Sequence, residues 1–228
     1  LKKKLYFMKL ALEQARRALG NTGQNPSVGC IITNNQHVIG SGHTGFNGRP
    51  HAETIAIRSI KKKTINSDIY ITLEPCSHFG KTSPCVDKII KKKFKRVFFS
   101  VNDPDYRSFS KSKKIFKKAG IKIHQGLLKT EINNFYKSYF NYKSNRLPYV
   151  SSKLAISKDF YLKDKKSKWI TKKQTRLRAH YLRYNHDSIL TTARTVIDDN
   201  PLLNCRIKGL EKFSPGRLII DKRLEISL

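Results

Sequence analysis

Apolar positions recur at helical spacing over the first twenty residues and then change to strand-like runs. Gly20-Asn21 ends the helical pattern. Two short apolar runs follow, VGCIIT (28–33) and HVIGSG (37–42), joined through Asn34-Asn35 as in a hairpin. The region therefore predicts an amphipathic helix followed by a β-hairpin. The helical positions are Met8, Leu12, Ala15 and Leu19.

Helical and strand patterns alternate from there to about residue 143. This alternation is typical of a sheet that carries helices on its faces, so we expect an α/β architecture. The predicted helices begin at His51 and run over VDKIIKKK (86–93), Ser110 to Ala119 and TEINNFYKSYFNYK (130–143). The predicted strands are DIYITL (68–73), RVFFSV (96–101) and IKIH (121–124).

A polar stretch, KSNRLP (143–148), predicts a linker, and we place a domain boundary between residues 144 and 145. About 80 residues follow Pro148, a size at which one core rarely supplies more than about 3–5 kcal/mol. We therefore expect the second domain to be incomplete and its activity to be weak. Its predicted elements are strands over YVSSKLAI (149–156), SILTT (188–192) and RLIID (217–221), and a helix from about Lys172 to Arg183.

The net charge of +31 has two interpretations. One is a nucleic-acid or acidic partner, and the other is a lysine-rich composition without a specific partner. The basic residues are spread along the chain, which favours the second interpretation, with no specific nucleic acid bound. No stretch approaches the roughly 20 apolar residues of a membrane helix, so we expect no membrane partner and a cytoplasmic protein.

Four cysteines in such a protein indicate metal binding or catalysis rather than disulfides. His51 and Glu53 lie two residues apart, and Cys76 and Cys85 each follow a proline. Three ligands, His51, Cys76 and Cys85, suit a catalytic Zn²⁺ that keeps one position open. Glu53 is then placed to move a proton between water and a leaving amine. We expect both prolyl-cysteines to begin helical turns.

The pattern H-x-E followed by P-C-x-x-C is the signature of zinc nucleobase deaminases. This chain matches its first half, but eight residues separate Cys76 from Cys85. A structural zinc with His78 as fourth ligand is one alternative, and a non-catalytic zinc-binding remnant is another. A deaminase acting on tRNA or another nucleic acid is a third alternative, favoured by the charge and disfavoured by the long cysteine spacing.

Several longer motifs resemble the bifunctional deaminase–reductases of riboflavin biosynthesis. In that family a diaminohydroxyphosphoribosylaminopyrimidine deaminase is fused to a 5-amino-6-(5-phosphoribosylamino)uracil reductase. In the first half the resemblance rests on NPSVGCII (25–32), PHAE (50–53), TLEPCSHFGKTSPC (72–85) and NDPD (102–105). In the second half it rests on PYVSSKLAIS (148–157), SKWIT (167–171), LRYNHDSILTTARTVIDDNPLLNCR (182–206) and GRLIID (216–221).

The resemblance implies a three-layer cytidine-deaminase-like domain over residues 1–144 and the first part of a dihydrofolate-reductase-like domain over 145–228. The first domain would act on a phosphoribosylaminopyrimidine, with Zn²⁺ on His51, Cys76 and Cys85 and with Glu53 as proton shuttle. The implied contacts of this substrate are Asn25, His78 and Lys81.

In the second domain the resemblance implies an NADPH site and a second set of substrate contacts. A homo-oligomer is compatible with the sequence, which does not fix the oligomeric state. The implied NADPH contacts are Ala155, Trp169, Thr195 and Asp199, and the implied substrate contacts are Ser167, Arg183, Leu203 and Arg206.

The chain departs from the family pattern at three places. Thr44 stands where family members usually have histidine, and His43 precedes it. YRSFSKS (106–112) stands where the family has a glycine-containing turn, and Phe160–Lys166 replaces a glycine-bearing loop.

Overall fold

The structure is a computed structural model that describes residues 1–61, 64–162 and 169–226. The chain divides into two compact units, Leu1–Tyr149 and Val150–Leu228. We expected the boundary between residues 144 and 145, within a polar linker. In the structure these two residues belong to the last turn of a helix that ends at Asn145. The amide of Asn145 donates to Asn141 Oδ1 one turn earlier, at 2.9 Å.

The first unit is built on a five-stranded sheet with the order β2-β1-β3-β4-β5. β1 pairs antiparallel with β2 and β3, whereas β3, β4 and β5 are parallel to one another. The strands are β1 (Gly29–Asn34), β2 (His37–His43), β3 (Asp68–Leu73), β4 (Arg96–Val101) and β5 (Lys122–Gln125). These bounds confirm the predicted strands of this region.

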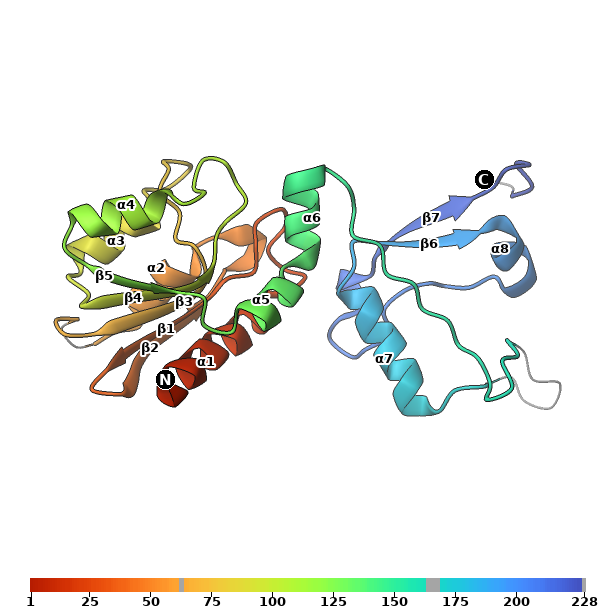
Figure 1. Cartoon of the computed structure of the whole chain (residues 1–228). Helices are drawn as coiled ribbons and strands as arrows, with labels where there is room; N and C mark the ends of the chain where they lie inside the picture. Colours follow the sequence, from red (N-terminus) through yellow and green to blue (C-terminus); the bar gives the residue numbers. More distant parts are fainter. Residues whose placement is uncertain (62–63, 163–168, 227–228) are drawn as a thin grey trace. The chain divides into compact units, whose positions relative to one another are not determined.

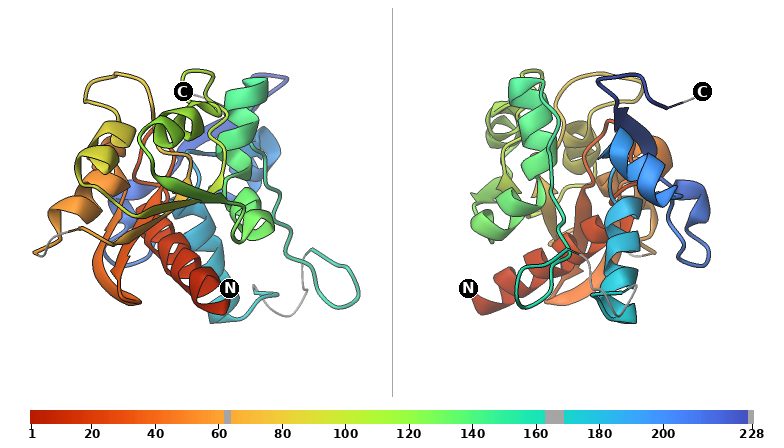
Figure 2. Two further views of the ribbon diagram at one scale, coloured as in Figure 1. Left: turned by 60° about the vertical axis from the view of Figure 1, so that its left-hand side comes forward. Right: turned by 90° about the vertical axis from the view of Figure 1, so that its right-hand side faces the viewer.

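Helices cover both faces of the sheet, as the alternation predicts (Figures 1 and 2). One face carries α2 (Ala52–Arg58), α3 (Cys85–Lys91) and α4 (Lys111–Lys118). The other face carries α1 (Lys2–Ala18), α5 (Lys129–Phe135) and the start of α6 (Lys137–Asn145). The first unit is therefore a three-layer α/β/α domain.

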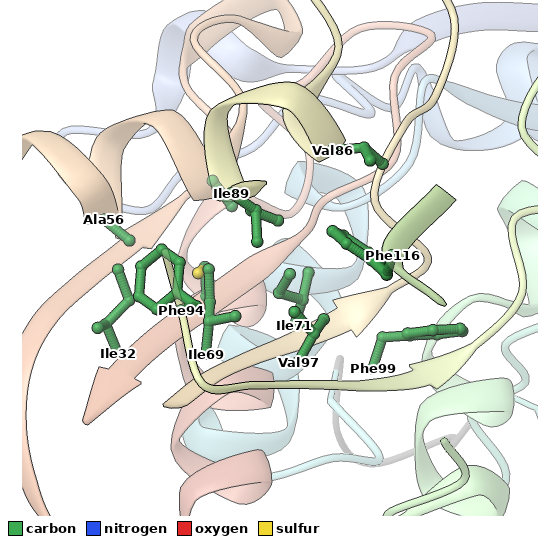
Figure 3. Packing of buried hydrophobic residues seen from close by; sticks show 12 residues of the cluster. Ile32, Ala56, Ile69, Ile71, Val86, Ile89, Phe94, Val97, Phe99 and Phe116 are labelled. Atoms are coloured by element: carbon green, nitrogen blue, oxygen red, sulfur yellow. The ribbon is translucent and has the colours of Figure 1, made fainter. Parts of the chain in front are cut away.

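Each face of the sheet has its own apolar core. On the α2–α4 face, strand residues such as Phe99 meet helix residues such as Ile89 and Phe116, all fully buried (Figure 3). On the opposite face, Met8 and Leu12 of α1 pack with Tyr70 and Phe98, whose rings stack at 4.5 Å between centroids. The two cores hold the sheet rigid beneath the loops that follow its strands.

The region 130–143 was predicted as one helix, and this prediction is wrong in one respect. The helix breaks at Tyr136 into α5 and α6. Tyr136 is buried, and its hydroxyl bonds to Thr72 Oγ1 at 2.6 Å and donates to the Ser27 carbonyl at 3.0 Å. The break thus falls at a residue whose side chain is anchored to distant parts of the chain, and the backbone there has φ −90° and ψ 9°.

The second unit contains α7 (Lys173–Tyr184), β6 (Ser188–Thr192), α8 (Ala193–Asp199) and β7 (Gly216–Ile220). β6 and β7 pair in parallel as a separate two-stranded sheet. Helix α7 and both strands confirm their predictions, whereas α8 was not predicted. The strand predicted over 149–156 is wrong, because these residues have no ladder partner in the structure and are largely exposed.

Burial is sparse in the second unit. Among its described residues, Ala193, Cys205 and Pro215 are buried, and every residue of β7 is exposed. In the described part of the chain, no helix combines the length and the apolar character needed to cross a membrane.

Candidate active site

Three elements of the first unit place His51, Cys76 and Cys85 together. His51 is the N-cap residue of α2, Cys85 is the first residue of α3, and Cys76 lies in the loop after β3. Only Cys85 begins a helix, so the expectation of a helical turn at Cys76 is wrong. The Cys76–Cys85 loop is instead closed by backbone bonds, with Val86 N–H donating to the Cys76 carbonyl at 3.2 Å.

A close approach between α2 and β2 fixes the position of His51. A Cβ atom on Gly42 of β2 would lie 2.5 Å from the Ala52 carbonyl oxygen. Glycine at this position therefore lets the first turn of α2 lie directly on the sheet. That contact places His51 and Glu53 at the edge of the sheet where Cys76 emerges.

The three side chains form a compact donor set. His51 Nδ1 lies 3.3 Å from Cys85 Sγ and 3.5 Å from Cys76 Sγ. All three donor atoms lie within 4.8 Å of one another, and the backbone N–H of Cys85 points to Cys76 Sγ at 3.3 Å. Zn–N and Zn–S bonds of about 2.1 and 2.3 Å separate neighbouring ligands of a tetrahedron by roughly 3.5–4 Å. One imidazole and two sulfur donors at these separations fit a zinc ion.

The electrostatics of the cluster favour a thiolate. The hydrogen bond from Cys85 lowers the pKa of Cys76 to about 4, and the bond from His51 adds to this effect. The bond to Cys76 and burial both raise the pKa of Cys85. The bond to Cys76 also raises the pKa of His51. A cation beside these groups would stabilise both sulfur atoms as thiolates.

Glu53 lies next to the donor set and is 4% exposed. Burial raises the pKa of its carboxyl group, and the negative charge of Cys76 raises it further. A buried carboxyl group with a raised pKa can both accept and return a proton near neutral pH. Glu53 is not among the residues grouped as ligands in the described part of the chain.

His78 also lies outside the three-residue donor set found in the described residues. Its Nδ1 contacts the hydroxyl of Ser108 at 2.9 Å. Burial lowers the pKa of His78, and the nearby Arg107 lowers it further. This geometry does not support the alternative of a structural zinc with His78 as fourth ligand.

Asn25 and Lys81 are exposed near the ends of loops. The side chain of Asn25 packs so closely on Gly48, at φ +84°, that a Cβ there would lie 2.1 Å from Asn25 Nδ2. Thr22 Oγ1 donates to the Asn25 carbonyl at 2.7 Å. The segment that carries Asn25 is thus held in place. Lys81 is exposed and has no side-chain hydrogen bond or ion pair among the described residues.

Thr44 has a structural role that the sequence did not reveal. Its buried hydroxyl donates to the Pro26 carbonyl at 3.0 Å and accepts from the Val28 N–H at 2.8 Å. These two bonds fix the backbone of Pro26 and Val28, between Asn25 and the start of β1. Nδ1 of the preceding residue, His43, lies 3.5 Å from Oε1 of Gln14.

Glu74 is a second residue that sequence reasoning missed. Its carboxylate is buried and accepts from Ser110 N–H at 3.0 Å and from Ser112 Oγ at 2.6 Å. Ser110 takes a left-handed conformation, φ +54°, in the segment where the family has a glycine-containing turn. The signal was available, because Glu74 is an acidic residue directly after a fully buried strand.

In the second unit, Arg183 and Arg206 lie on either side of Asn204. Arg183 Nη1 donates to the Asn204 carbonyl at 3.0 Å, and Arg206 Nη1 donates to Asn204 Oδ1 at 3.3 Å. Burial lowers the pKa of Arg183, and the charge of Arg206 lowers it further. His180 was not predicted, yet its Nδ1 accepts from the Arg206 N–H at 3.2 Å. The cluster brings two guanidinium groups to one residue, an arrangement suited to binding an anion.

The remaining predicted residues of the second unit, where the structure describes them, come from helix α8 and from different loops. Thr195 lies in the first turn of α8, where its N–H donates to Thr192 Oγ1 at 3.5 Å, and Asp199 ends that helix. Ala155 lies in a segment without regular secondary structure. The guanidinium of Arg176 lies 4.4 Å from the centroid of the Trp169 ring. Leu203 is half-buried in a loop. Ser167 and most of Phe160–Lys166 lie outside the described residues.

Comparison with known families assigns both halves. Residues 1–101 match the cytidine and deoxycytidylate deaminase zinc-binding region, and residues 148–228 match the RibD C-terminal domain. The riboflavin biosynthesis protein RibD of Bacillus amyloliquefaciens is 39% identical over 97% of this chain and 60% of that protein. RibD of Aquifex aeolicus is 37% identical over 97% of this chain and 63% of that protein.

Solved structures give the same result. A crystal structure from Thermotoga maritima has a TM-score of 0.91 and 34% identity, over 97% of this chain and 64% of that chain. It is described as a diaminohydroxyphosphoribosylaminopyrimidine deaminase/5-amino-6-(5-phosphoribosylamino)uracil reductase. Acinetobacter baumannii RibD, form 1, has a TM-score of 0.88 and 33% identity, over 100% of this chain and 65% of that chain. The chain spans about 60–65% of the length of these relatives.

Proposed function

We propose that this chain, which belongs to the RibD family of riboflavin biosynthesis proteins, deaminates a diaminohydroxyphosphoribosylaminopyrimidine. One observation carries the proposal. His51, Cys76 and Cys85 lie within 4.8 Å of one another, and the buried Glu53 follows His51 by two residues. This is a donor set for one metal ion together with one proton carrier.

His51, Cys76 and Cys85 would hold the zinc ion. When bound, zinc supplies Lewis acidity that makes water acidic enough to ionise near neutral pH. Glu53 takes the proton that water loses and delivers it to the amino group of the pyrimidine, which leaves as ammonia. Water thereby replaces one amino group by a carbonyl oxygen, and Glu53 returns to its starting state. Its burial and raised pKa suit both halves of this transfer.

The proposed substrate contacts are those that the family resemblance implies, and the chemistry of each residue supports its role. Asn25 offers an amide that can read a pyrimidine edge, and its backbone is held by Thr22. Lys81 is an exposed cation in the loop between the two cysteines, where it can reach a phosphoribosyl group. His78 lies two residues after Cys76 and offers an imidazole nitrogen to the substrate.

The second unit is proposed to take NADPH and the deaminated product. Arg183 and Arg206, bridged by Asn204, would bind the substrate phosphate. Leu203 and Ser167 are the further proposed substrate contacts. Ala155, Trp169, Thr195 and Asp199 are the proposed cofactor contacts.

The deaminase proposal is tested with the purified chain, the diaminopyrimidine ribotide as substrate, and zinc quantified in the same sample. We expect ammonia release by the wild type and a loss of about 10²–10⁴-fold in Glu53→Gln, with zinc retained. Glu13→Gln is the matched control, because Glu13 is an exposed residue of α1 whose partner is Arg16. It should keep wild-type activity.

Three results separate this proposal from its alternatives. Activity of Glu53→Gln within a few-fold of the wild type would remove Glu53 from the mechanism. Deamination of an RNA substrate in place of the ribotide would favour a nucleic-acid deaminase. A fully zinc-loaded chain with no activity on either substrate would identify a zinc-binding remnant.

A further inference from the structure

We propose that Ser108 is a positioning residue that fixes the ring orientation and the tautomer of His78. Ser108 is fully buried, 30 residues from His78 in sequence, and its Oγ lies 2.9 Å from His78 Nδ1. Neither the motif around Cys76 nor the NDPD segment predicts this contact. The contact between Ser108 and His78 does not depend on the proposed function. The inference rests on that function only where it has His78 Nε2 bind the substrate.

The turn that carries Ser108 is itself held firmly. The N–H of Ser108 donates to the Asp105 carbonyl at 2.8 Å. The carboxylate of Asp105 accepts from Arg107 at 2.9 and 2.6 Å and pairs with Lys143 of α6 at 3.4 Å. The N–H of Asp105 donates to Asp103 Oδ1 at 3.0 Å. The hydroxyl of Ser108 is therefore presented from a fixed backbone.

The second side of the turn is anchored to the strand that precedes Cys76. Glu74 accepts from the N–H groups of Ser110 and Ser112, at 3.0 and 3.2 Å. The same buried carboxylate stands two residues before Cys76, and His78 stands two residues after it. The donor set, His78 and the Ser108 turn are consequently joined in one hydrogen-bonded frame.

The burial of Ser108 decides the direction of the bond. A buried hydroxyl proton without an acceptor is unfavourable, and His78 Nδ1 is the acceptor that the described structure offers it. Ser108 therefore donates to Nδ1, which leaves the ring proton of neutral His78 on Nε2. In the described part of the chain Nε2 has no protein partner. His78 thus presents an N–H donor, which suits a carbonyl or phosphate oxygen of the substrate.

The first test does not depend on turnover. Carbon-13 NMR of the histidine rings distinguishes the two neutral tautomers in the zinc-loaded chain. The protein has 7 histidines, so the His78 signal is assigned by its loss in His78→Ala. We expect the Nε2–H form in the wild type and a mixture of tautomers in Ser108→Ala. An unchanged His78 signal in Ser108→Ala, or an Nδ1–H form in the wild type, would overturn the inference.

The second test separates positioning from general damage to the fold. Loss of one orienting hydrogen bond should raise KM about 3- to 10-fold in Ser108→Ala and change kcat less than about twofold. Ser108→Thr keeps the hydroxyl and should restore much of the loss. In the background of His78→Ala, the change at Ser108 should have no further effect, because the residue that it positions is gone.

Ser100→Ala is the matched control. Ser100 is also a fully buried serine of this unit, but its Oγ has no hydrogen-bond partner among the described residues. It should leave KM and the His78 signal unchanged. Equal effects of Ser108→Ala and Ser100→Ala, or full additivity with His78→Ala, would show that Ser108 acts only through stability. If the wild type does not deaminate the ribotide, the proposed function fails, while the NMR result still decides the role of Ser108.

Discussion

The two units of this chain differ in how they hold their polar residues. In the first unit, apolar cores on both faces of the sheet support loops whose carboxylates and hydroxyls are buried and bonded, such as Glu74 and Thr44. In the second unit, Arg183 and Arg206 meet around Asn204, but strand β7 of the same unit is exposed along its length. A site is rigid when its supporting residues are themselves packed, and by this measure the site of the first unit is the better pre-organised of the two, as far as the described residues show.

The largest expected difference between the two units is the effect of replacing a buried cysteine, because a cysteine of the first unit is a proposed zinc ligand. Cys85→Ser should reduce bound zinc from one ion per chain to a small fraction, because a neutral hydroxyl replaces a thiolate ligand. Deamination should be lost with it, and the first unit should be destabilised, because metal binding is linked to folding. Zinc analysis, activity and thermal unfolding of the purified variant measure all three.

Cys205→Ser provides the control in the second unit. Cys205 is equally buried, but it lies outside the donor set of the described residues. This variant should keep zinc and deaminase activity. Stoichiometric zinc in Cys85→Ser under mild chelation would show that the ligand assignment is wrong.

The second prediction compares the two proposed activities, deamination by the first unit and NADPH-dependent reduction by the second. Hydride transfer requires a cofactor and a substrate held in fixed geometry away from water. Few described residues of the second unit are buried, and its sheet is open. We therefore expect NADPH oxidation with the deaminated product to be slower than deamination by the same sample. The absorbance of NADPH follows the reaction, and equal turnover numbers would contradict the comparison.

The third prediction compares how much a side chain from each sheet contributes to the free energy of unfolding. Phe99 is fully buried in the core of the first unit, whereas Leu218 of β7 is 52% exposed. Phe99→Ala should lower the free energy of unfolding of the first unit by about 3–5 kcal/mol. Leu218→Ala should cost less than about 1 kcal/mol, because little apolar surface returns to water. Denaturant unfolding of both variants gives the values, and similar losses would show a hidden core in the second unit.

Periodicity predicts local structure well where one strong pattern dominates. The strands of the first unit, its three-layer arrangement and the grouping of His51, Cys76 and Cys85 all follow from the sequence. The strand predicted over 149–156 failed because a short stretch of strand-like residues does not by itself supply a pairing partner. A strand needs a neighbour, and the neighbour is set by tertiary structure.

Tertiary hydrogen bonds account for most of the remaining misses. The helix over 130–143 breaks where Tyr136 bonds to Thr72 and Ser27, far away in sequence. Ser108, Glu74 and Thr44 support the site, yet each is a common residue in an unremarkable local sequence. Sequence patterns predict which residues carry chemistry, but they do not predict which distant residues hold them in position.

The fourth prediction uses the pH dependence of stability of the first unit. Burial raises the pKa of Asp103 from its ordinary value of 3.8 to about 6, against the opposing bonds from Asp105 N–H and Tyr139. The folded state therefore holds a proton between these pH values that the unfolded state has lost. Stability falls as pH rises through this window, by up to about 3 kcal/mol at 1.36 kcal/mol per pKa unit.

Asp103→Asn should flatten this part of the profile, because asparagine has no proton to lose and keeps Oδ1 as acceptor. It should be more stable than the wild type at pH 7 and close to it near pH 3. Asp105→Asn should behave in the opposite way. In the wild type, the hydrogen bond from Arg107 lowers the pKa of Asp105. The contribution of Asp105 to the free energy of unfolding is therefore present above its ordinary pKa and is lost as the pH falls below that value. Parallel profiles for Asp103→Asn and the wild type would contradict the assignment.

The smallest expected effect is a difference between the units in nucleic-acid binding. Residues 1–149 contain 29 Lys and Arg and 8 Asp and Glu, a net charge of +21, and residues 150–228 contain 18 and 8, a net charge of +10. The charge per residue is nearly the same in both units, as a lysine-rich composition predicts and a dedicated binding surface does not. RNA affinity should therefore fall steeply with added salt and show no sequence preference. Gel-shift titrations with two unrelated RNAs at two salt concentrations measure both properties. Salt-resistant binding of one RNA over the other would assign a specific nucleic-acid site to this chain and return the nucleic-acid deaminase to consideration.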